Sequence, residues 1–381
     1  MLRRLSFGLL VAGISSLACL LVLEVVLRVT GLQEDFFVQL DPDVGATYIP
    51  NKSGWFVFPD GRTWAEINSY GYLDQEWTIE KPSGVTRIVL LGDSYLAGME
   101  VPVGQRASDE LARVLNESCA GRKFEVLNFG VIGFGTAQEL ETLRHHALKF
   151  SPDLVALFVY TGNDLYNNSR ELDVEPNRIH YEIDAAGKLE RLPYVVRDNA
   201  IKQWLRHHSR AFLFLRSGVK RAQALHLAMM KAGLMQEMAV KDDSPAPTLR
   251  GFQYKRNPPP PIERAWRITE ELIVETKRVA GSADAEFVVV VVPTKEEILD
   301  TVTPAEVGDD MDLQVPVQRL EAICEARDLK CLSLTKAFAS RSASRIEDSF
   351  FKGGGHWTAV GHETAARSIF DWLRPDLCGR N

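Results

Sequence analysis

The 381-residue sequence has no cluster of basic residues beyond short pairs, and its formal net charge is −7. Proteins that bind a phosphate backbone concentrate Lys and Arg on one surface, so nucleic acid is not an expected partner. The chain also has no internal repeat, and a hydrophobic content of 45% excludes the composition of disordered chains. The length allows one large domain, or one domain with a substantial insertion.

Cysteine is scarce as well. The five cysteines lack the C-x-x-C spacing of a metal site, and we expect neither a metal nor a cofactor. In an exported domain the four cysteines after the N-terminal segment can pair, and Cys324 with Cys331 is the favoured pair, because a helix end followed by a strand start would bring them together. The alternative is that they are buried thiols, which pack as small hydrophobic residues.

Only one long hydrophobic run is present, near the N-terminus. Arg3 and Arg4 precede an uncharged, mostly apolar run over residues 5–23, which as a helix is about 28 Å long and sufficient to cross a bilayer. The charge placement predicts a cytoplasmic N-terminus and an extracytoplasmic (periplasmic or extracellular) remainder. Residues 1–31 are therefore expected to be a membrane anchor, with a cleaved signal peptide as the alternative.

The remaining sequence has the rhythm of an α/β domain. Residues 32–86 are turn-rich and are expected to form an extended lead-in. After them, short β-rich runs alternate with amphipathic ones, which predicts a doubly wound sheet of about five parallel strands. Strands are expected at 88–91, 124–129, 154–160, 287–292 and 329–334, and helices at 107–115, 138–150, 262–280, 317–326 and 361–373.

The alternation stops between residues 165 and 261, after the third strand. A connection this long is expected to carry structure of its own, so we predict a helical insertion that could serve as a lid, inserted between domain segments 87–164 and 262–373. Its basic amphipathic segment runs from Ala200 to about Met238. We expect this segment to pack on the domain, and the alternative is that it lies on an anionic membrane surface.

The tripeptide Gly92-Asp93-Ser94 directly follows the first expected strand. A small hydroxyl at the carboxyl end of a parallel strand lies where open α/β sheets bind their ligands, so Ser94 is a candidate nucleophile. On the tripeptide alone, a turn in which Asp93 and Ser94 merely cap the next helix is an equal alternative.

Three further stretches follow strands or lie near the chain end. A Gly-rich loop from Asn128 to Thr136 allows backbone N–H groups to approach a ligand. Asn163, after the third strand, is able to donate its side-chain amide to an oxyanion, with an Asx turn as the alternative. His356 lies in a Gly-rich loop before a helix, free of helical packing, and is a candidate general base.

In this order the four stretches resemble the conserved blocks of the SGNH (GDSL-type) hydrolase family. The lead-in segment from Ile67 to Asp74 also resembles that of membrane-tethered bacterial members. The resemblance implies a flavodoxin-like fold with Ser94 as the nucleophile and His356 as the base. It further implies that the oxyanion donors are the backbone N–H of Ser94, the N–H of Gly133 and the side chain of Asn163.

The sequence departs from the family pattern at one point. The family usually has an Asp two or three residues before the catalytic His, and those positions are Gly354 and Gly353 here. Three interpretations follow. The serine and histidine act as a dyad with a backbone carbonyl on the imidazole, the carboxylate of Asp348 or Glu347 reaches back, or catalysis is weak or lost.

The expected function combines the resemblance with the expected location. We expect an exported serine esterase that acts on O-acyl esters, such as O-acetyl groups, of cell-envelope glycans. An acyltransferase of the same fold is one alternative. A non-catalytic glycan- or acyl-binding protein that lost the triad acid is another, and a cytoplasmic lipase is disfavoured by the anchor.

Overall fold

The computed structural model describes residues 2–31, 36–173, 175, 178–196, 199–218, 251–299, 310–340, 343–353 and 355–379. The chain divides into two compact units, of which the smaller combines Met1–Phe37 with Arg197–Asp243 and the larger comprises Val38–Val196 and Ser244–Asn381. The smaller unit contains helix α1 (Leu2–Thr30), whose stretch Phe7–Thr30 is long and apolar enough to cross a membrane. This helix is therefore a candidate anchor or signal segment.

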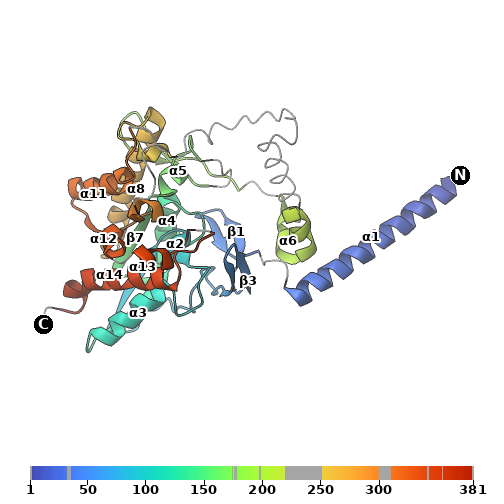
Figure 1. Cartoon of the computed structure of the whole chain (residues 1–381), viewed down its shortest axis with the longest axis horizontal. Coiled ribbons are helices and arrows are strands. Elements are labelled where there is room, and N and C mark those ends of the chain that lie inside the picture. The colour runs from blue at the N-terminus through green and yellow to red at the C-terminus, as the bar shows by residue number, and fades with distance from the viewer. Residues whose placement is uncertain are drawn as a thin grey trace. The chain divides into compact units, whose positions relative to one another are not determined.

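Five parallel strands form the central sheet of the larger unit. One of them, β7, is labelled in Figure 1. Their order is β11-β10-β7-β5-β6, which is the flavodoxin-like order, and the predicted fold class is confirmed. After β6, on one side of β5, the chain crosses to β7 on the other side. The carboxyl ends of these three strands therefore meet at the topological switch point, where open sheets bind ligands. The strands are β5 (Val85–Leu91), β6 (Lys123–Asn128), β7 (Leu154–Tyr160), β10 (Glu286–Val292) and β11 (Lys330–Ser333).

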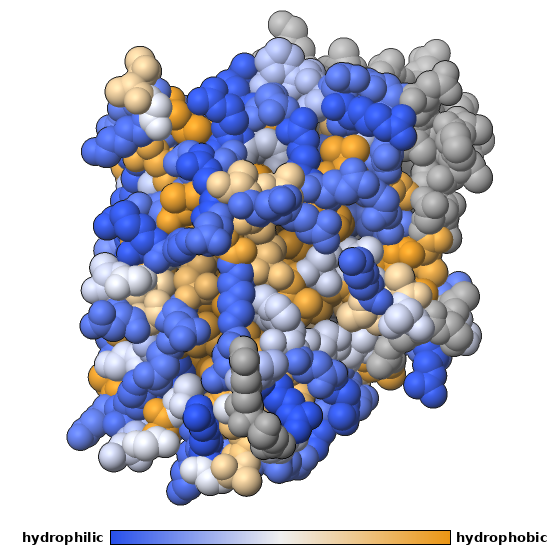
Figure 2. Space-filling view, turned by 90° about the vertical axis from the view of Figure 1, so that its left-hand side faces the viewer, coloured by the Kyte–Doolittle hydropathy of each residue, from blue (hydrophilic) through white to orange (hydrophobic). Residues whose placement is uncertain are grey.

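The strands are apolar runs because helices cover both faces of the sheet. Ile88, Leu90 and Val126 belong to a core that includes side chains of α3 (Ala107–Ser118) and α14 (Ala359–Leu377). The alternate strand positions point to the opposite face, where α4 (Thr136–Thr142) and α8 (Pro260–Gly281) contact each other. The face in Figure 2 is largely hydrophilic, with apolar patches between the polar side chains.

The predicted elements agree with the observed ones to within a few residues. The predicted helix at 138–150 is an exception in form, since α4 continues as a wider π-helical turn at Leu143–Ala147 and a 3₁₀ turn at Leu148–Phe150. The remaining helices of the larger unit are α2 (Ser94–Ala97), α5 (Asp164–Asn167), α9 (Lys295–Leu299), α11 (Val315–Ala326), α12 (Thr335–Ala339) and α13 (Ala343–Asp348), with a 3₁₀ turn at Phe252–Tyr254.

Two predicted segments have more structure than expected. The lead-in contains two antiparallel hairpins, β1 (Val38–Asp41) with β2 (Gly45–Tyr48) and β3 (Ser53–Phe58) with β4 (Gly61–Glu66). The insertion at 165–261 is not purely helical, because β8 (Tyr181–Ile183) and β9 (Leu189–Arg191) form a hairpin. Its turn is closed by the Asp184 carboxylate, which accepts hydrogen bonds from the N–H groups of Ala186 and Lys188.

The predicted basic helix of the insertion is described only in its first part. Helix α6 (Ala200–His208) is followed after Ser209 by a second helical stretch over residues 210–218. Residues 219–250, which include the predicted continuation to Met238, lie outside the described residues.

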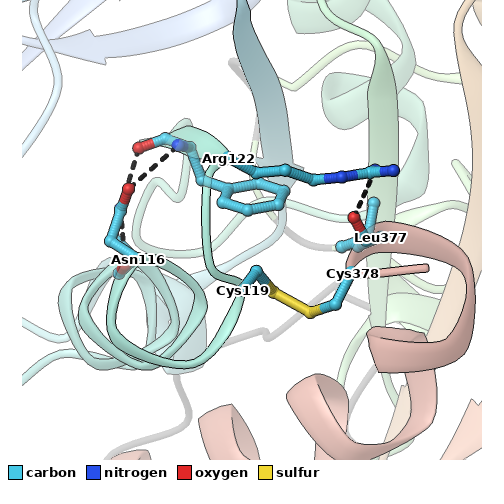
Figure 3. Close-up of a disulfide and its surroundings, with 7 residues drawn as sticks. Asn116, Cys119, Arg122, Leu377 and Cys378 are labelled. Atoms are coloured by element: carbon cyan, nitrogen blue, oxygen red, sulfur yellow. Dashed lines mark hydrogen bonds between the residues drawn. A yellow bond between two sulfur atoms is a disulfide. The ribbon is translucent and has the colours of Figure 1, made fainter. Parts of the chain in front are cut away.

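The described residues contain two disulfides. Cys324 and Cys331 are bonded as predicted, and Cys119 is bonded to Cys378, which joins the end of α3 to the end of α14 (Figure 3). Next to this second bond, Arg122 donates a hydrogen bond to the carbonyl of Leu377 at 2.5 Å. The C-terminal helix is thereby fastened to the segment that leads into β6.

Removal of the long-range disulfide is expected to destabilise the protein strongly. Cys119 and Cys378 are 259 residues apart, so the bond restricts the unfolded chain far more than the Cys324–Cys331 bond, whose cysteines are 7 apart. The double change Cys119→Ser/Cys378→Ser should lower the free energy of unfolding by about 2–5 kcal/mol. Urea unfolding of the full-length protein in detergent measures it, with Cys324→Ser/Cys331→Ser as the control. A larger loss in the control would contradict the expectation.

Candidate active site

The nucleophile turn follows β5 directly. The carboxylate of Asp93 accepts a hydrogen bond from the N–H of Tyr95 at 2.9 Å and caps α2, whose first residue is Ser94. The capping alternative and the nucleophile prediction are therefore compatible, because Asp93 caps while Ser94 stands at the strand tip. A Cβ at Gly130 would lie 2.5 Å from the backbone N of Ala97, so the Gly-rich loop allows α2 to pack closely against it.

Ser94, His356 and an unpredicted carboxylate form a continuous chain of polar contacts. The Oγ atom of Ser94 lies 2.8 Å from Nε2 of His356. The other ring nitrogen, Nδ1, lies 2.9 Å from Oε1 of Glu100, whose side chain is only 9% exposed. A hydroxyl, an imidazole and a carboxylate in this order are the groups of a nucleophile, a general base and the acid that orients the base.

The carboxylate at His356 is thus Glu100, and neither Asp348 nor Glu347 occupies that position. Both candidates are exposed at the end of α13. The following loop folds back on itself, with hydrogen bonds from Phe351 N to the His356 carbonyl and from Thr358 N to the Ser349 carbonyl. This pairing holds the end of α13 alongside Thr358, whose Oγ1 donates to the carbonyl of Asp348.

Glu100 was missed because it belongs to the nucleophile segment rather than to the histidine loop. Helix α2 has a single turn and ends at Gly98, whose φ of +62° reverses the chain direction. Its neighbours Met99 and Val101 are buried, with 2% exposure each. An acidic residue between two buried apolar residues was the signal that the sequence offered, because buried carboxylates are rare unless they have partners.

The contact with Glu100 changes the protonation of the base. Burial of His356 favours the neutral imidazole, but the hydrogen bond to Glu100 and the negative charges of Glu100 and Asp93 outweigh it and raise the pKa of His356 above its ordinary value. The imidazolium that forms when the base takes a proton is therefore stabilised by Glu100.

The loop that carries His356 is held from two sides. The hydroxyl of Tyr95, next to the nucleophile, donates to the carbonyl of Gly355 at 2.8 Å. The carboxylate of Asp60, at the tip of the β3–β4 hairpin, accepts from the N–H of Gly353 at 2.7 Å. The lead-in hairpin, which the sequence did not connect with the site, therefore helps to position the loop that carries His356.

The loop that carries Gly133 is fixed next to the nucleophile turn. The N–H of Val131 donates to the carbonyl of Gly92 at 3.1 Å, and the N–H of Ile132 donates to the buried hydroxyl of Tyr48 at 3.0 Å. Gly133 itself has a φ of +76°, a backbone conformation that favours glycine. Its carbonyl accepts from Arg178, a residue that the sequence reading also missed.

Asn163 follows β7 and faces the same turn. It precedes α5, yet among the described residues its side chain makes no capping hydrogen bond, so the Asx-turn alternative is not observed. Its side chain interacts with the Asp93 carboxylate and lowers the pKa of that group, while burial raises that pKa more strongly, to about 6. The side-chain amide of Asn163 has two N–H donors and is able to donate to a ligand.

Three carboxyl groups are buried close to one another behind these loops: Asp93, Glu139 and Asp164. Burial raises the pKa values of Glu139 and Asp164 well above the ordinary range, and mutual repulsion with Asp93 adds to the effect. Both oxygens of Glu139 are buried and accept no hydrogen bond from any described residue. Burial without a hydrogen-bonding partner among the described residues therefore favours the protonated form of Glu139.

Glu139→Gln is expected to stabilise the protein, increasingly so at higher pH. Folding raises the pKa of Glu139 above its value of about 4.5 in the unfolded chain. The contribution of Glu139 to the free energy of unfolding is therefore fully present below pH 4.5 and is lost as the pH rises. Glutamine carries no such titration, so the gain should be small at pH 5 and about 1–3 kcal/mol at pH 8–9. Thermal unfolding at several pH values measures it.

Glu141, on the same helix, is the matched control. It is also buried, but it pairs with Arg144 at 2.7 Å and with Arg191 at 2.9 Å. Glu141→Gln should therefore destabilise the protein. Equal destabilisation by both changes would show that Glu139 is not held protonated and unpaired.

Comparison with known families supports the sequence reading over part of the chain. Residues 257–379 match a family model described as the SGNH hydrolase-like domain of acetyltransferase AlgX. The match covers less than half of the chain and includes His356, and the resemblance inferred from the sequence blocks is confirmed over these residues. Ser94, Glu100, Gly133 and Asn163 lie before the matched residues.

Solved structures show a likeness of fold only. A lipase/acylhydrolase from Enterococcus faecalis is 15% identical, with a TM-score of 0.40, over 76% of this chain and 96% of that one. A putative GDSL-like lipase from Parabacteroides merdae is 12% identical, with a TM-score of 0.42, over 78% and 99%. The comparison with curated protein sequences gives no match.

Proposed function

We propose that the protein is a serine-dependent enzyme that transfers acyl groups from O-acyl esters, with Ser94 as the nucleophile. The observation that supports this most is the continuous contact from Ser94 Oγ through both ring nitrogens of His356 to Glu100, at 2.8 and 2.9 Å. A binding protein that had lost its triad acid would not need a buried carboxylate aligned on the imidazole.

The first half of the reaction forms an acyl-enzyme. Ser94 Oγ attacks the ester carbonyl carbon while Nε2 of His356 takes the hydroxyl proton. The oxyanion accepts hydrogen bonds from the N–H groups of Ser94 and Gly133 and from the side chain of Asn163. The carbon–oxygen bond to the alcohol then breaks, and His356 returns the proton to the departing alcohol oxygen. The Glu100 carboxylate stabilises the imidazolium.

The second half passes the acyl group to an acceptor hydroxyl. His356 takes the proton of that hydroxyl as its oxygen attacks the acyl-enzyme, and Ser94 leaves with the proton returned. With water as the acceptor the enzyme is an esterase, and with a sugar hydroxyl it is an acyltransferase. The description of the matched family names an acetyltransferase, which favours acetyl as the acyl group that is transferred. A cell-envelope glycan as the carrier of the ester is our proposal from the expected location and the family resemblance.

The proposed location is outside the cytoplasm, with α1 in the membrane. Two bonded cysteine pairs in the larger unit support an oxidising compartment. The apolar helix after Arg3 and Arg4 supports an anchor with a cytoplasmic N-terminus. Both features fit a substrate in the cell envelope.

Active-site labelling tests the nucleophile. A fluorophosphonate probe should label the full-length protein, label Ser94→Ala not at all and label His356→Ala far more slowly. Equal labelling of Ser94→Ala and wild type would exclude Ser94 as the nucleophile. With p-nitrophenyl acetate as the acyl donor, recovery of the acetyl group on an added oligosaccharide rather than as free acetate would identify a transferase.

A further inference from the structure

The last two turns of α1 are joined to the insertion by several hydrogen bonds within the smaller unit. The carboxylate of Glu24 accepts from the hydroxyl of Ser209 at 3.0 Å and from the N–H groups of Arg210 and Ala211 at 3.1 and 2.8 Å. These are the first groups of the helical stretch 210–218, so Glu24 caps that helix from another part of the chain. Arg28 donates to the carbonyl of His208 at 2.7 Å, at the end of α6.

These hydrogen bonds fix the position of residues 208–211 along the axis of the apolar helix α1. The uncharged run ends at Leu23, and its length of about 28 Å matches the hydrocarbon core of a bilayer. Glu24 and Arg28 follow this run in the last two turns of the candidate span Phe7–Thr30, where the helix leaves the core. A segment bonded to these two side chains lies at the level of the lipid headgroups.

The composition of residues 199–218 is suited to the headgroup region of a membrane. The stretch has no Asp or Glu, and its basic residues are Lys202, Arg206, Arg210 and Arg216. Ile201 and Trp204 lie on one side of α6 and are 71% and 60% exposed, and Leu215 in the next helix is 51% exposed. Basic side chains beside exposed apolar ones, with a Trp among them, are typical of helices that lie in the membrane interface.

We infer that residues 199–218 form an interfacial platform, two helical stretches that lie on the anionic surface of the membrane that α1 spans. Charge indicates what the exposed face of residues 199–218 contacts. A stretch with basic and no acidic residues attracts anionic lipid headgroups. The inference favours a retained anchor, since cleavage after α1 would remove the Glu24 cap. It does not depend on the catalytic proposal.

Site-specific labelling of the full-length protein in nanodiscs tests this. The cysteine of the variant Cys19→Ser/Ile201→Cys is labelled with the environment-sensitive dye NBD. The nanodiscs contain phosphatidylcholine, phosphatidylglycerol and a doxyl-labelled lipid that quenches NBD on contact. We expect blue-shifted NBD emission that the doxyl lipid quenches at least twofold. The matched control is Ile79→Cys, an exposed isoleucine of the larger unit, which should show neither effect.

Two outcomes would overturn the inference. Emission like that of the Ile79 control would place residue 201 in water. A blue shift without doxyl quenching would mean that the helix packs on protein. The charge contribution is tested with Lys202→Glu/Arg216→Glu, which should lower the quenching at residue 201 severalfold, whereas the exposed pair Lys123→Glu/Lys188→Glu should leave it unchanged. An unchanged signal in the first variant would exclude an anionic surface as the partner.

Discussion

Ser94→Ala is expected to lower kcat by about 10⁶-fold, and His356→Ala should lower it to nearly the same residual rate. The two side chains are joined by a 2.8 Å contact and act in the same proton transfer, so either loss disables the same step. The double variant should therefore be no slower than either single variant. Steady-state hydrolysis of p-nitrophenyl acetate by the full-length protein in detergent measures all three rates.

The control for this series is Ser118→Ala, an exposed serine at the end of α3, which should retain the wild-type rate. If the effects of Ser94→Ala and His356→Ala multiplied in the double variant, the two residues would act in separate steps. That result would contradict the proposed mechanism.

Glu100→Gln is expected to lower kcat by about 10³–10⁴-fold, close to the loss that follows removal of the orienting acid in comparable triads. It should also change the pH profile. The base acts when neutral, so activity falls as His356 gains a proton, and the raised pKa places this acidic limb above pH 6.5. Glutamine removes the charge that stabilises the imidazolium, so the limb should move to lower pH.

Two controls separate this from a general structural effect. Glu117→Gln removes an exposed carboxylate from α3 and should change neither rate nor profile. Asp348→Asn should likewise leave both unchanged, because Asp348 does not contact the imidazole ring. A loss of activity in Glu100→Gln without any movement of the acidic limb would mean that Glu100 supports the fold rather than the base.

The fold was largely predictable because its strands are buried on both faces. Stretches such as Leu154–Tyr160 and Glu286–Val292 consist almost wholly of apolar residues, and their alternation with amphipathic helices leaves few possible topologies. The hairpins at β1–β4 and β8–β9 were not predicted, since their strands are short, partly exposed and weakly patterned. Their pairing depends on turns and on contacts with the rest of the domain.

The placement of the candidate site residues was predictable where they follow strand ends and not where it depends on a reversal of the chain. Ser94, Gly133 and Asn163 each follow a recognisable strand, and the parallel topology brings these strand ends together. Glu100 reaches His356 only because the single turn of α2 ends at a left-handed Gly98. The carboxylate that contacts His356 was sought among residues close to the histidine in sequence. Glu100 instead follows Ser94, far from His356 along the chain.

The Cys119–Cys378 bond gives the polypeptide a covalent ring. Ser94 and Glu100 lie on the tail before the ring, whereas Asn163, the insertion and His356 lie within it. A protease that cuts once inside the ring opens it without releasing a fragment, so both halves of the site stay tethered to each other. On non-reducing gels the nicked protein should migrate as one species, and only a reductant should separate the nucleophile from its base.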